Sequence, residues 1–161
     1  ITELALHEIS NCCLDKQISI GVAESVTAGY LQFTLSQLPH ALNIFNGGIT
    51  AYNIGQKVKH LGVDYIQGVS CNCVSATTAE IMALNVCHLL NSNMGIAITG
   101  YASPVPEEEI SQLYAFMAIA YKDKIVHTHQ LHSKETSAQE AQKEYVLQVI
   151  TEMLSYLESL H

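Results

Sequence analysis

Residues 18–29 read ISIGVAESVTAG, and this stretch decides how the rest of the sequence is interpreted. Its first half, residues 18–23, is a short apolar run rich in β-branched residues, which predicts a buried strand. A helix is expected next, over residues 27–38. It should end there because Pro39 disfavours its continuation. A buried strand followed at once by a helix is typical of α/β proteins.

The same alternation of helices and short apolar strands extends through the first hundred residues. It predicts a mostly parallel sheet that is covered on both faces. A final pair of strands, joined by a tight turn at 122–123, would add antiparallel pairing. We therefore expect one domain over residues 1–161, a three-layer α/β/α fold with a mixed, mostly parallel sheet. The other expected elements are helices at 2–16, 56–61, 75–90 and 135–160, strands at 47–52, 94–99, 113–121 and 124–131, and a loop at 101–111.

The composition of the 161 residues excludes several classes of protein. Hydrophobic residues make up 48% and charged residues 14%, which argues against intrinsic disorder. The net charge is −8, and the seven basic residues are all lysines that form no cluster, so no nucleic-acid partner is expected. The longest apolar runs fall short of the roughly 20 residues that span a bilayer, so no membrane partner is expected either.

The five cysteines indicate a reducing compartment. Their number is odd and their spacing irregular, which disfavours a disulfide framework. Cys71 and Cys73 form a single C-x-C pair, whereas structural zinc sites usually need two such pairs. We therefore interpret the cysteines as free thiols used as small apolar residues, and expect a cytoplasmic protein.

Candidate chemistry lies where the predicted parallel strands end, because ligands of such sheets bind beyond the carboxyl ends of the strands. Ser25 lies between a strand and a helix, where backbone N–H groups favour a developing oxyanion. The alternative is that Ser25 or Thr27 merely caps that helix. Lys57 could act as a general base if its pKa were lowered toward neutrality. The alternative makes Lys57 a solvated helix residue and Tyr52 a sheet-edge aromatic.

Four segments together resemble the C-terminal domain of the CinA competence/damage-inducible protein family. The segments are AESVTAGYL (23–31), FNGGITAYNIGQKVKHLGV (45–63), GVS (68–70) and GIAITG (95–100). Their order and spacing fit the family pattern from about residue 18 to residue 145, and the first two motifs together are specific. The resemblance implies the family's α/β/α fold.

The family includes nicotinamide-nucleotide amidohydrolases, which convert nicotinamide mononucleotide and water to nicotinate mononucleotide and ammonia in pyridine-nucleotide salvage. The resemblance implies Ser25 as the nucleophile, with Tyr52 and Lys57 as the activating pair, and it implies neither a metal nor another cofactor. Residues of the matching motifs are expected to orient Ser25 or to bind the small-molecule substrate: Glu24, Thr27, Gly29, Gly48, Asn53, Thr99 and Gly100.

Two departures from the family pattern concern the expected phosphate site. The family usually carries a glycine-rich loop after Gly100, but here the loop contains Ser103 and the acidic run 107–109. The family also tends to carry arginines before the last helix, whereas this chain has none and offers only Lys134 and Lys143 there. These departures leave two alternatives open: a diverged, inactive domain that binds a ligand or a protein, and an amidase for a substrate without a phosphate.

His127 and His129 alternate on one predicted strand, and His132 follows. They could form a partial metal site or a phosphate contact, but such histidines are more often partly exposed strand residues. The low charge and the apolar composition also lead us to expect self-association into a homo-oligomer.

Overall fold

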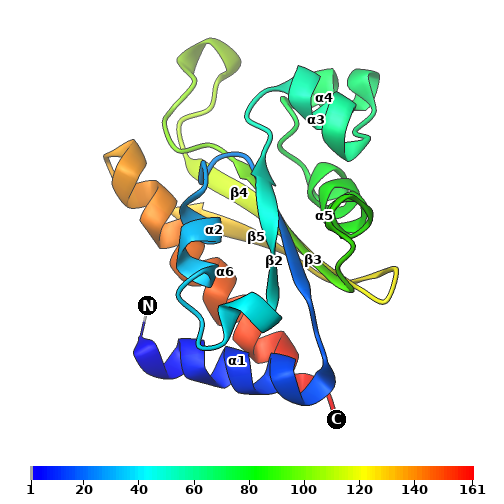
Figure 1. The fold of residues 1–161 in the computed structure, drawn as a ribbon. Helices are drawn as coiled ribbons and strands as arrows, with labels where there is room; N and C mark the ends of the chain where they lie inside the picture. Colours follow the sequence, from blue (N-terminus) through cyan, green and yellow to red (C-terminus); the bar gives the residue numbers. More distant parts are fainter. Residues whose placement is uncertain (1) are drawn as a thin grey trace.

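The computed structural model describes residues 2–161, which form a five-stranded sheet with helices on both faces (Figure 1). The strand order across the sheet is β2-β1-β3-β4-β5. The strands are β1 (Ile20–Glu24), β2 (Phe45–Thr50), β3 (Met94–Gly100), β4 (Leu113–Tyr121) and β5 (Lys124–Ser133).

The sheet is mixed, as the sequence predicts. β1 pairs in parallel with β2 on one side and β3 on the other. β4 pairs antiparallel with both β3 and β5, so four strands run in one direction and β4 runs against them. The α/β/α prediction is confirmed, with antiparallel pairing confined to the half of the sheet that contains β4 and β5.

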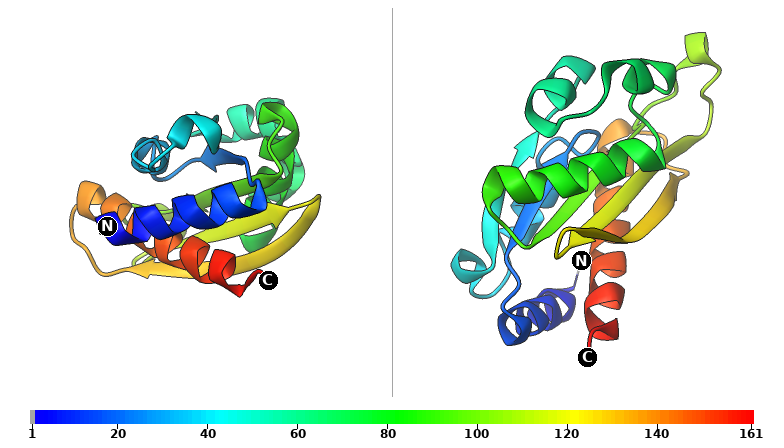
Figure 2. Two further views of the ribbon diagram at one scale, coloured as in Figure 1. Left: turned by 60° about the horizontal axis from the view of Figure 1, so that its bottom comes forward. Right: turned by 90° about the vertical axis from the view of Figure 1, so that its right-hand side faces the viewer.

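The helices divide into two layers. α1 (Glu3–Lys16), α2 (Tyr30–Leu35) and α6 (Ala138–Ser159) cover one face, and α1 lies beside α6 (Figure 2). α3 (Ile54–Leu61) and α5 (Ala76–Leu90) cover the other face, and α4 (Tyr65–Ser70) packs against α3 beyond the end of the sheet. The connection from β1 to β2 therefore crosses one face, and the connection from β2 to β3 crosses the other.

The two faces of the sheet bury side chains of different size. The face under α1, α2 and α6 is filled by large residues such as Ile96 and Met117. The face under α5 carries small residues at the equivalent positions, including Gly95, Ala97 and Ala118. A Cβ on Gly95 would lie 2.1 Å from the carbonyl oxygen of Ala83, so α5 approaches the sheet more closely than any side chain there allows.

Several predicted boundaries were wrong. The helix expected at 27–38 is shortened to Tyr30–Leu35, because residues 26–29 form a turn in which Ala28 and Gly29 have positive φ angles. The second strand begins at Phe45, two residues early, because Phe45 pairs with Ile20. The last helix begins at Ala138 rather than 135, because Ser137 caps it by accepting a hydrogen bond from the Glu140 N–H. The loop at 101–111 contains a short 3-10 turn at Pro106–Glu108.

One helix was missed. α4 begins after Asp64, whose carboxylate accepts a hydrogen bond from the Gln67 N–H at 2.9 Å. Asp64 and Gln67 have the spacing of a capping box, and this signal was present in the sequence. The helix is short, and its end leads into Asn72 and Cys73, which both have positive φ angles.

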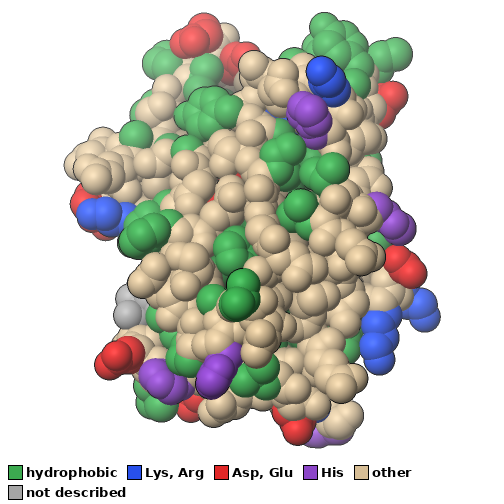
Figure 3. Space-filling model, in the orientation of Figure 1, with side chains coloured by type: hydrophobic (Ala, Val, Ile, Leu, Met, Phe, Trp, Pro, Cys, Tyr) green, Lys and Arg blue, Asp and Glu red, His purple; other side chains and the backbone are tan. Residues whose placement is uncertain are grey.

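Charged side chains are sparse on the molecular surface. The face seen in Figure 3 shows scattered lysines, acidic residues and histidines, with no more than two basic side chains side by side, at its right edge. None of the helices between residues 2 and 161 combines the length and the apolar character that crossing a membrane requires. The five cysteines are free thiols, as expected.

Candidate functional site

Ser25 lies directly after β1, at the centre of the parallel part of the sheet. Its N–H donates to the Ile98 carbonyl on one side, at 3.1 Å, and the Ala51 N–H donates to the Glu24 carbonyl on the other. Both bonds continue the strand ladders past the last residue of β1. Since the crossovers from β1 and β2 use opposite faces, Ser25 lies at a topological switch point, where open α/β sheets bind ligands.

The turn after Ser25 contains backbone N–H groups that make no hydrogen bond within the described chain. Ala28 donates its N–H to the Ser25 carbonyl at 3.0 Å, which closes the turn. Within the described chain the N–H groups of Val26 and Thr27 have no acceptor. The Gln142 side chain, from α6, donates to the Val26 carbonyl at 2.9 Å and so fixes this turn from outside. The expected oxyanion donors therefore come from the turn, not from a helix end.

Glu24 and Thr27 lie beneath the turn rather than in the cavity. The Glu24 carboxylate is fully buried and accepts hydrogen bonds from the Leu31 N–H at 2.8 Å, the Gln32 N–H at 2.9 Å and the Thr27 hydroxyl at 2.5 Å. The side chain of a strand residue thus caps α2, whose own N-cap is Gly29 and makes no side-chain bond. Neither Ser25 nor Thr27 is the N-cap, so that alternative was wrong. Glu24 and Thr27 orient the Ser25 turn by holding α2 against it.

Lys57 is buried on α3, with only 3% of its surface exposed. Burial lowers the pKa of Lys57 from its usual 10.5, and the nearby Cys73 thiol opposes this in part. No acidic side chain among residues 2–161 forms an ion pair with Lys57. The alternative of a solvated lysine was therefore wrong, and the structure provides the desolvation that a lysine base requires.

Ser25 and Lys57 line one cavity of about 250 Å³. Fully buried side-chain polar atoms without a partner are limited, in the described part of the chain, to Ser92 Oγ. Ser25 Oγ and Lys57 Nζ have no protein partner either, so both remain accessible from the cavity. A ligand in the cavity would meet a hydroxyl group and an amine that no other protein group occupies.

Tyr52 and Asn53 stand at the rim. Tyr52 follows the edge strand β2 and is 63% exposed, as a sheet-edge aromatic would be, and it also lines the cavity. Asn53 caps α3 by accepting a hydrogen bond from the Gln56 N–H at 3.0 Å. The two residues also line a neighbouring hollow of about 290 Å³, which shares Tyr52, Lys57 and Asn72 with the cavity. The accessible space therefore continues past Tyr52 toward α4.

The other expected site residues divide between the cavity and its supports. Thr99 and Gly100 line the cavity at the end of β3, and the Thr99 hydroxyl donates to the Cys73 carbonyl at 2.6 Å. Gly29, with φ of +98°, forms the turn before α2 but does not line the cavity. Gly48 is also absent from the lining: a Cβ there would lie 2.5 Å from the Gln32 side chain.

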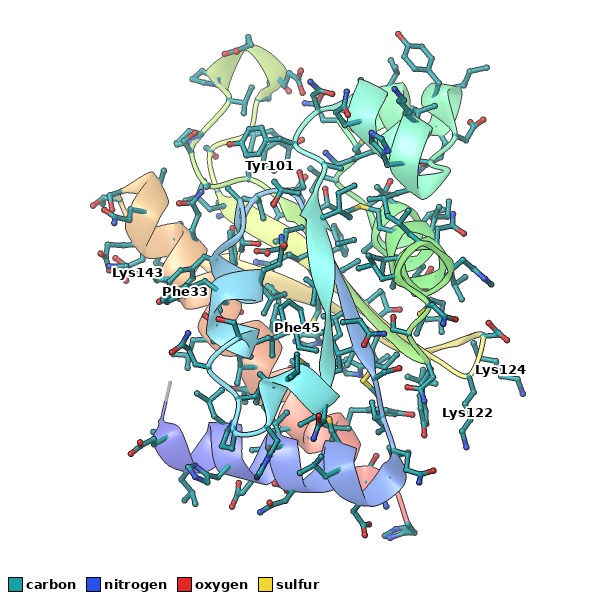
Figure 4. The ribbon with its side chains drawn as sticks, in the orientation of Figure 1. Phe33, Phe45, Tyr101, Lys122, Lys124 and Lys143 are labelled. Carbon is teal, nitrogen blue, oxygen red and sulfur yellow. The ribbon has the colours of Figure 1, made fainter. Side chains whose placement is uncertain are left out.

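The loop at 101–111 closes one side of the cavity. Figure 4 shows Tyr101 at this end of the sheet, between the loop and the chain that leads from α4 to α5. The Asn72 side chain donates hydrogen bonds to the Tyr101 hydroxyl, at 3.5 Å, and to the Glu108 carboxylate. Burial raises the pKa of Tyr101, so it remains a neutral phenol. Asn72 therefore fastens the loop to the rim of the cavity.

Replacing Asn72 by glycine should loosen this loop. Glycine tolerates the positive φ of 55° at this position but removes both side-chain bonds. We expect a loss of about 1 kcal/mol in loop closure, which corresponds to about fivefold faster cleavage after residues 107–109 by a glutamate-specific protease. Asn91→Gly is the matched control, because Asn91 also has a positive φ but lies at the end of α5. Equal cleavage of Asn72→Gly and the wild type would contradict this role.

The lysines proposed to replace the family's arginines lie elsewhere. Lys134 lines a separate hollow of about 550 Å³ with Pro104 and His132, on the other side of the loop. Lys143 lies on α6, and Lys122 and Lys124 lie at the far end of the sheet from Tyr101 (Figure 4). Among the described residues, Lys57 is the one cation that lines the cavity with Ser25.

The cavity lining also includes residues that were not predicted, among them Asn72, Tyr101 and Gln142. Tyr101 follows the strand predicted at 94–99, whereas Asn72 follows α4, the helix that was missed, and neither residue belongs to a motif. Gln142 lies 116 residues from its partner Val26, and no local pattern could have joined them. These residues reach the cavity through the packing of α4, α6 and the end of β3.

The family model of the CinA C-terminal domain matches residues 3–157.

The chain belongs to the CinA C-terminal domain family.

Curated relatives from two Streptococcus pyogenes strains, of serotypes M5 and M12, are named competence-damage inducible protein. Each is 39% identical over 107 residues, which are 66% of this chain and 25% of the relative. The aligned part of this CinA domain thus spans a quarter of the length of those relatives.

Solved CinA superfamily structures share the fold. One from Klebsiella pneumoniae has a TM-score of 0.89 at 18% identity and covers 98% of both chains. One from Enterobacter cloacae has a TM-score of 0.88 at 21% identity, and the match covers 95% of this chain and 90% of that one. At these identities the likeness establishes the CinA fold alone.

Proposed function

We propose that this CinA domain hydrolyses a carboxamide to a carboxylate and ammonia, with Ser25 as the nucleophile. One observation carries the proposal: Ser25 and a buried, unpaired Lys57 line the same small cavity, and burial lowers the pKa of Lys57. A serine hydroxyl is a weak nucleophile unless a nearby base takes its proton. A desolvated lysine is such a base, because burial favours its neutral form.

The first half of the proposed reaction forms an acyl-enzyme. Neutral Lys57 accepts the Ser25 proton as Oγ attacks the amide carbon, and the carbonyl oxygen becomes an oxyanion. The free N–H groups of Val26 and Thr27 are the candidate donors to that oxyanion. The protonated Lys57 then returns a proton to the departing nitrogen, the C–N bond breaks, and ammonia leaves.

The second half regenerates the enzyme. Lys57 takes a proton from water as the water oxygen attacks the acyl carbon, and the protonated Lys57 then returns that proton to Ser25 Oγ as the ester C–O bond breaks. The acid that leaves loses its own proton to solvent and becomes the carboxylate. Tyr52 is close enough to the cavity to contact the substrate or this water, but its exposure favours a role in binding at the rim. The Asn72 contacts would keep the loop closed over the bound substrate.

Nicotinamide mononucleotide is the first substrate to test, since the family resemblance implies it. The cavity of about 250 Å³ is small, which suits a pyridine carboxamide ring, and the neighbouring hollow offers room for the rest of a nucleotide. A phosphate there would find no arginine and would face the acidic loop. The structure therefore favours weak discrimination between the nucleotide and its unphosphorylated nucleoside.

Ammonia release from three amides tests this function. We expect turnover of both nicotinamide mononucleotide and nicotinamide riboside, with kcat/KM values within about tenfold of each other. The two differ by a phosphate, and no arginine is present to bind that phosphate and so favour the mononucleotide. Free nicotinamide should be poorer, because it lacks the binding energy of the remote part. Ammonia is measured by a coupled enzymatic assay, and the carboxylate by chromatography. Absence of turnover of every amide at micromolar enzyme would refute the proposed function.

A second function is a binding domain without catalysis. The observation that favours it is the cavity wall itself: among residues 2–161, Lys57 is the one cation in the lining, and Glu108 is fastened beside the rim. Thermal stabilisation by nicotinamide mononucleotide without ammonia release would support this alternative. Stabilisation together with release would support the amidase.

A further inference from the structure

A second group of chemically active side chains lies between β5 and α6, outside the Ser25 cavity. It consists of His127 and His129 from β5 and Glu152 from α6. His127 Nε2 lies 2.8 Å from one carboxylate oxygen of Glu152, and His129 Nε2 lies 3.4 Å from the other. The two imidazole rings are stacked with their centroids 6.0 Å apart. None of the three residues lines the Ser25 cavity.

The fold brings these residues together by strand and helix geometry. His127 and His129 are two apart on β5, so both point to the face that α6 covers. Glu144, Gln148 and Glu152 are spaced by four along α6 and form a stripe beside β5. Glu144 accepts a hydrogen bond from Ser133, and Gln148 donates to the His132 carbonyl, which fixes the helix along the strand. Glu152 then lies against the two imidazoles, where α6 runs along β5 (Figure 2).

His132 does not join the group. It lies on the opposite face of β5 from His129 and lines the hollow with Lys134. The sequence pattern of three histidines thus resolves into a pair that shares a carboxylate and a third residue in a different place. The pair and Glu152 are the one group of at least three potential ligands that converge among residues 2–161.

The trio has the ligand types and spacing of a transition-metal site. Two imidazole nitrogens and one carboxylate oxygen form a common set for zinc and for similar divalent ions. Metal–ligand bonds of about 2.0–2.1 Å in a tetrahedral site place neighbouring ligand atoms about 3.3 Å apart. The two separations between Nε2 and a Glu152 oxygen, 2.8 and 3.4 Å, bracket that distance, and the ligand atoms all lie within 4.8 Å of one another.

The site is also accessible. The side chains of His127 and Glu152 are 29% and 26% exposed, and that of His129 is 50% exposed, so an ion can enter and water can complete its coordination. β5 is one of the two edge strands, and in the described part of the chain no further strand lies beyond it. In the described chain the Nδ1 atoms of His127 and His129 donate to no protein group. Hydrogen bonds from a second layer of residues, which often strengthen metal binding by histidine, are therefore not formed here.

We propose that His127, His129 and Glu152 bind one divalent transition-metal ion of the zinc type. Each Nε2 and one Glu152 oxygen supply a lone pair, and one or more water molecules fill the remaining positions. The bound ion links the edge strand β5 to α6, so it stabilises the folded domain by mass action. The site lies apart from the Ser25 cavity, and its role does not depend on the proposed amidase activity.

Titration of the metal-free protein with ZnCl₂ tests the proposal. We expect one ion per chain with a Kd in the micromolar range, and a rise in Tm of about 5 to 10 °C when free zinc exceeds the Kd a hundredfold. His129→Ala should weaken binding at least about tenfold and remove the rise. Glu152→Gln is the second variant, because it can still hydrogen-bond to His127 and therefore tests ligation with little change in packing.

His88→Gln is the matched control. His88 is an exposed histidine that lies 3.9 Å from a single carboxylate, that of Asp123, so it should bind zinc no better than any surface residue. CoCl₂ supplies a spectroscopic readout: nitrogen and oxygen ligands give visible bands without the thiolate charge-transfer band that the free cysteines would produce. Absence of stoichiometric binding, a thiolate band, or equal binding by His129→Ala, Glu152→Gln and the wild type would overturn the proposal.

Discussion

Replacing Ser25 by alanine is expected to lower kcat for ammonia release by about 10³-fold or more, the range seen when a serine nucleophile is removed from a hydrolase. The change deletes one oxygen that contacts no other protein group, so the cavity and its binding contacts stay. KM should therefore change little, and the effect should fall on kcat. Initial rates over a range of nicotinamide mononucleotide concentrations separate the two parameters.

Thermal stability gives the control for this variant. Ser25 is 6% exposed and its hydroxyl makes no internal hydrogen bond, so the alanine variant should unfold within about 1 kcal/mol of the wild type. A well-folded Ser25→Ala protein that keeps more than a tenth of the wild-type kcat would exclude Ser25 as the nucleophile. The proposed amide hydrolysis would then require another group in the cavity.

Lys57→Arg should be nearly as damaging as the loss of Ser25. Arginine keeps the positive charge but does not lose its proton at any working pH, so it cannot act as the base.

In the wild type, kcat/KM should rise with pH and reach a plateau once Lys57 is neutral. Because burial lowers the pKa of Lys57, the midpoint should lie below the usual 10.5. A profile that falls across this range, or an active Lys57→Arg variant, would argue against a lysine base.

Replacing Glu24 by alanine is expected to be the most destabilising single change near the site. The fully buried carboxylate accepts bonds from two backbone N–H groups at the start of α2 and from the Thr27 hydroxyl. Alanine leaves these donors without an acceptor and creates a cavity, so we expect a loss of about 3 to 5 kcal/mol in the free energy of unfolding. Urea denaturation, with the m-value compared between proteins, measures the loss.

Glu24→Gln keeps this prediction testable if the alanine variant does not fold. The amide retains one acceptor oxygen but turns a donor toward a backbone N–H, so an intermediate loss of about 1 to 2 kcal/mol is expected. The neighbouring Ser25→Ala variant serves as the reference. If Glu24→Ala were as stable as the wild type, α2 would have to be capped by another group. If the variant differed from the wild type in KM alone, Glu24 would be a substrate-binding residue rather than a cap.

The arrangement of the sheet could be predicted from the sequence because its strands are short apolar runs. Residues 94–99 illustrate this, since such a run bounded by polar residues leaves few alternatives to a buried strand. The short helices were harder. Ala28 adopts a positive φ that alanine rarely takes, so the helix after Ser25 begins later than its composition suggests. Tertiary contacts, above all the Glu24 carboxylate, decide where that helix starts.

The candidate site was predictable only where a motif spans it. Ser25, Tyr52 and Lys57 lie in the two segments that carry the family resemblance, and the structure brings them to one cavity. Glu24 and Thr27 belong to the same motif, yet they support the turn from below. Gln142 and Asn72 reach the cavity from distant segments, and their contacts follow from how α6 and α4 pack. Sequence spacing alone contains no information on such contacts.

The unequal faces of the sheet constrain how this domain can diverge. Under α5, a methyl group gained at Gly95 would collide with the carbonyl oxygen of Ala83, so substitution at this position is restricted. The loop at 101–111 is held at its tip by an exposed contact from Asn72 and can change with little effect on the rest. The loop beside the cavity can therefore change while the scaffold keeps Ser25 and Lys57 in fixed positions.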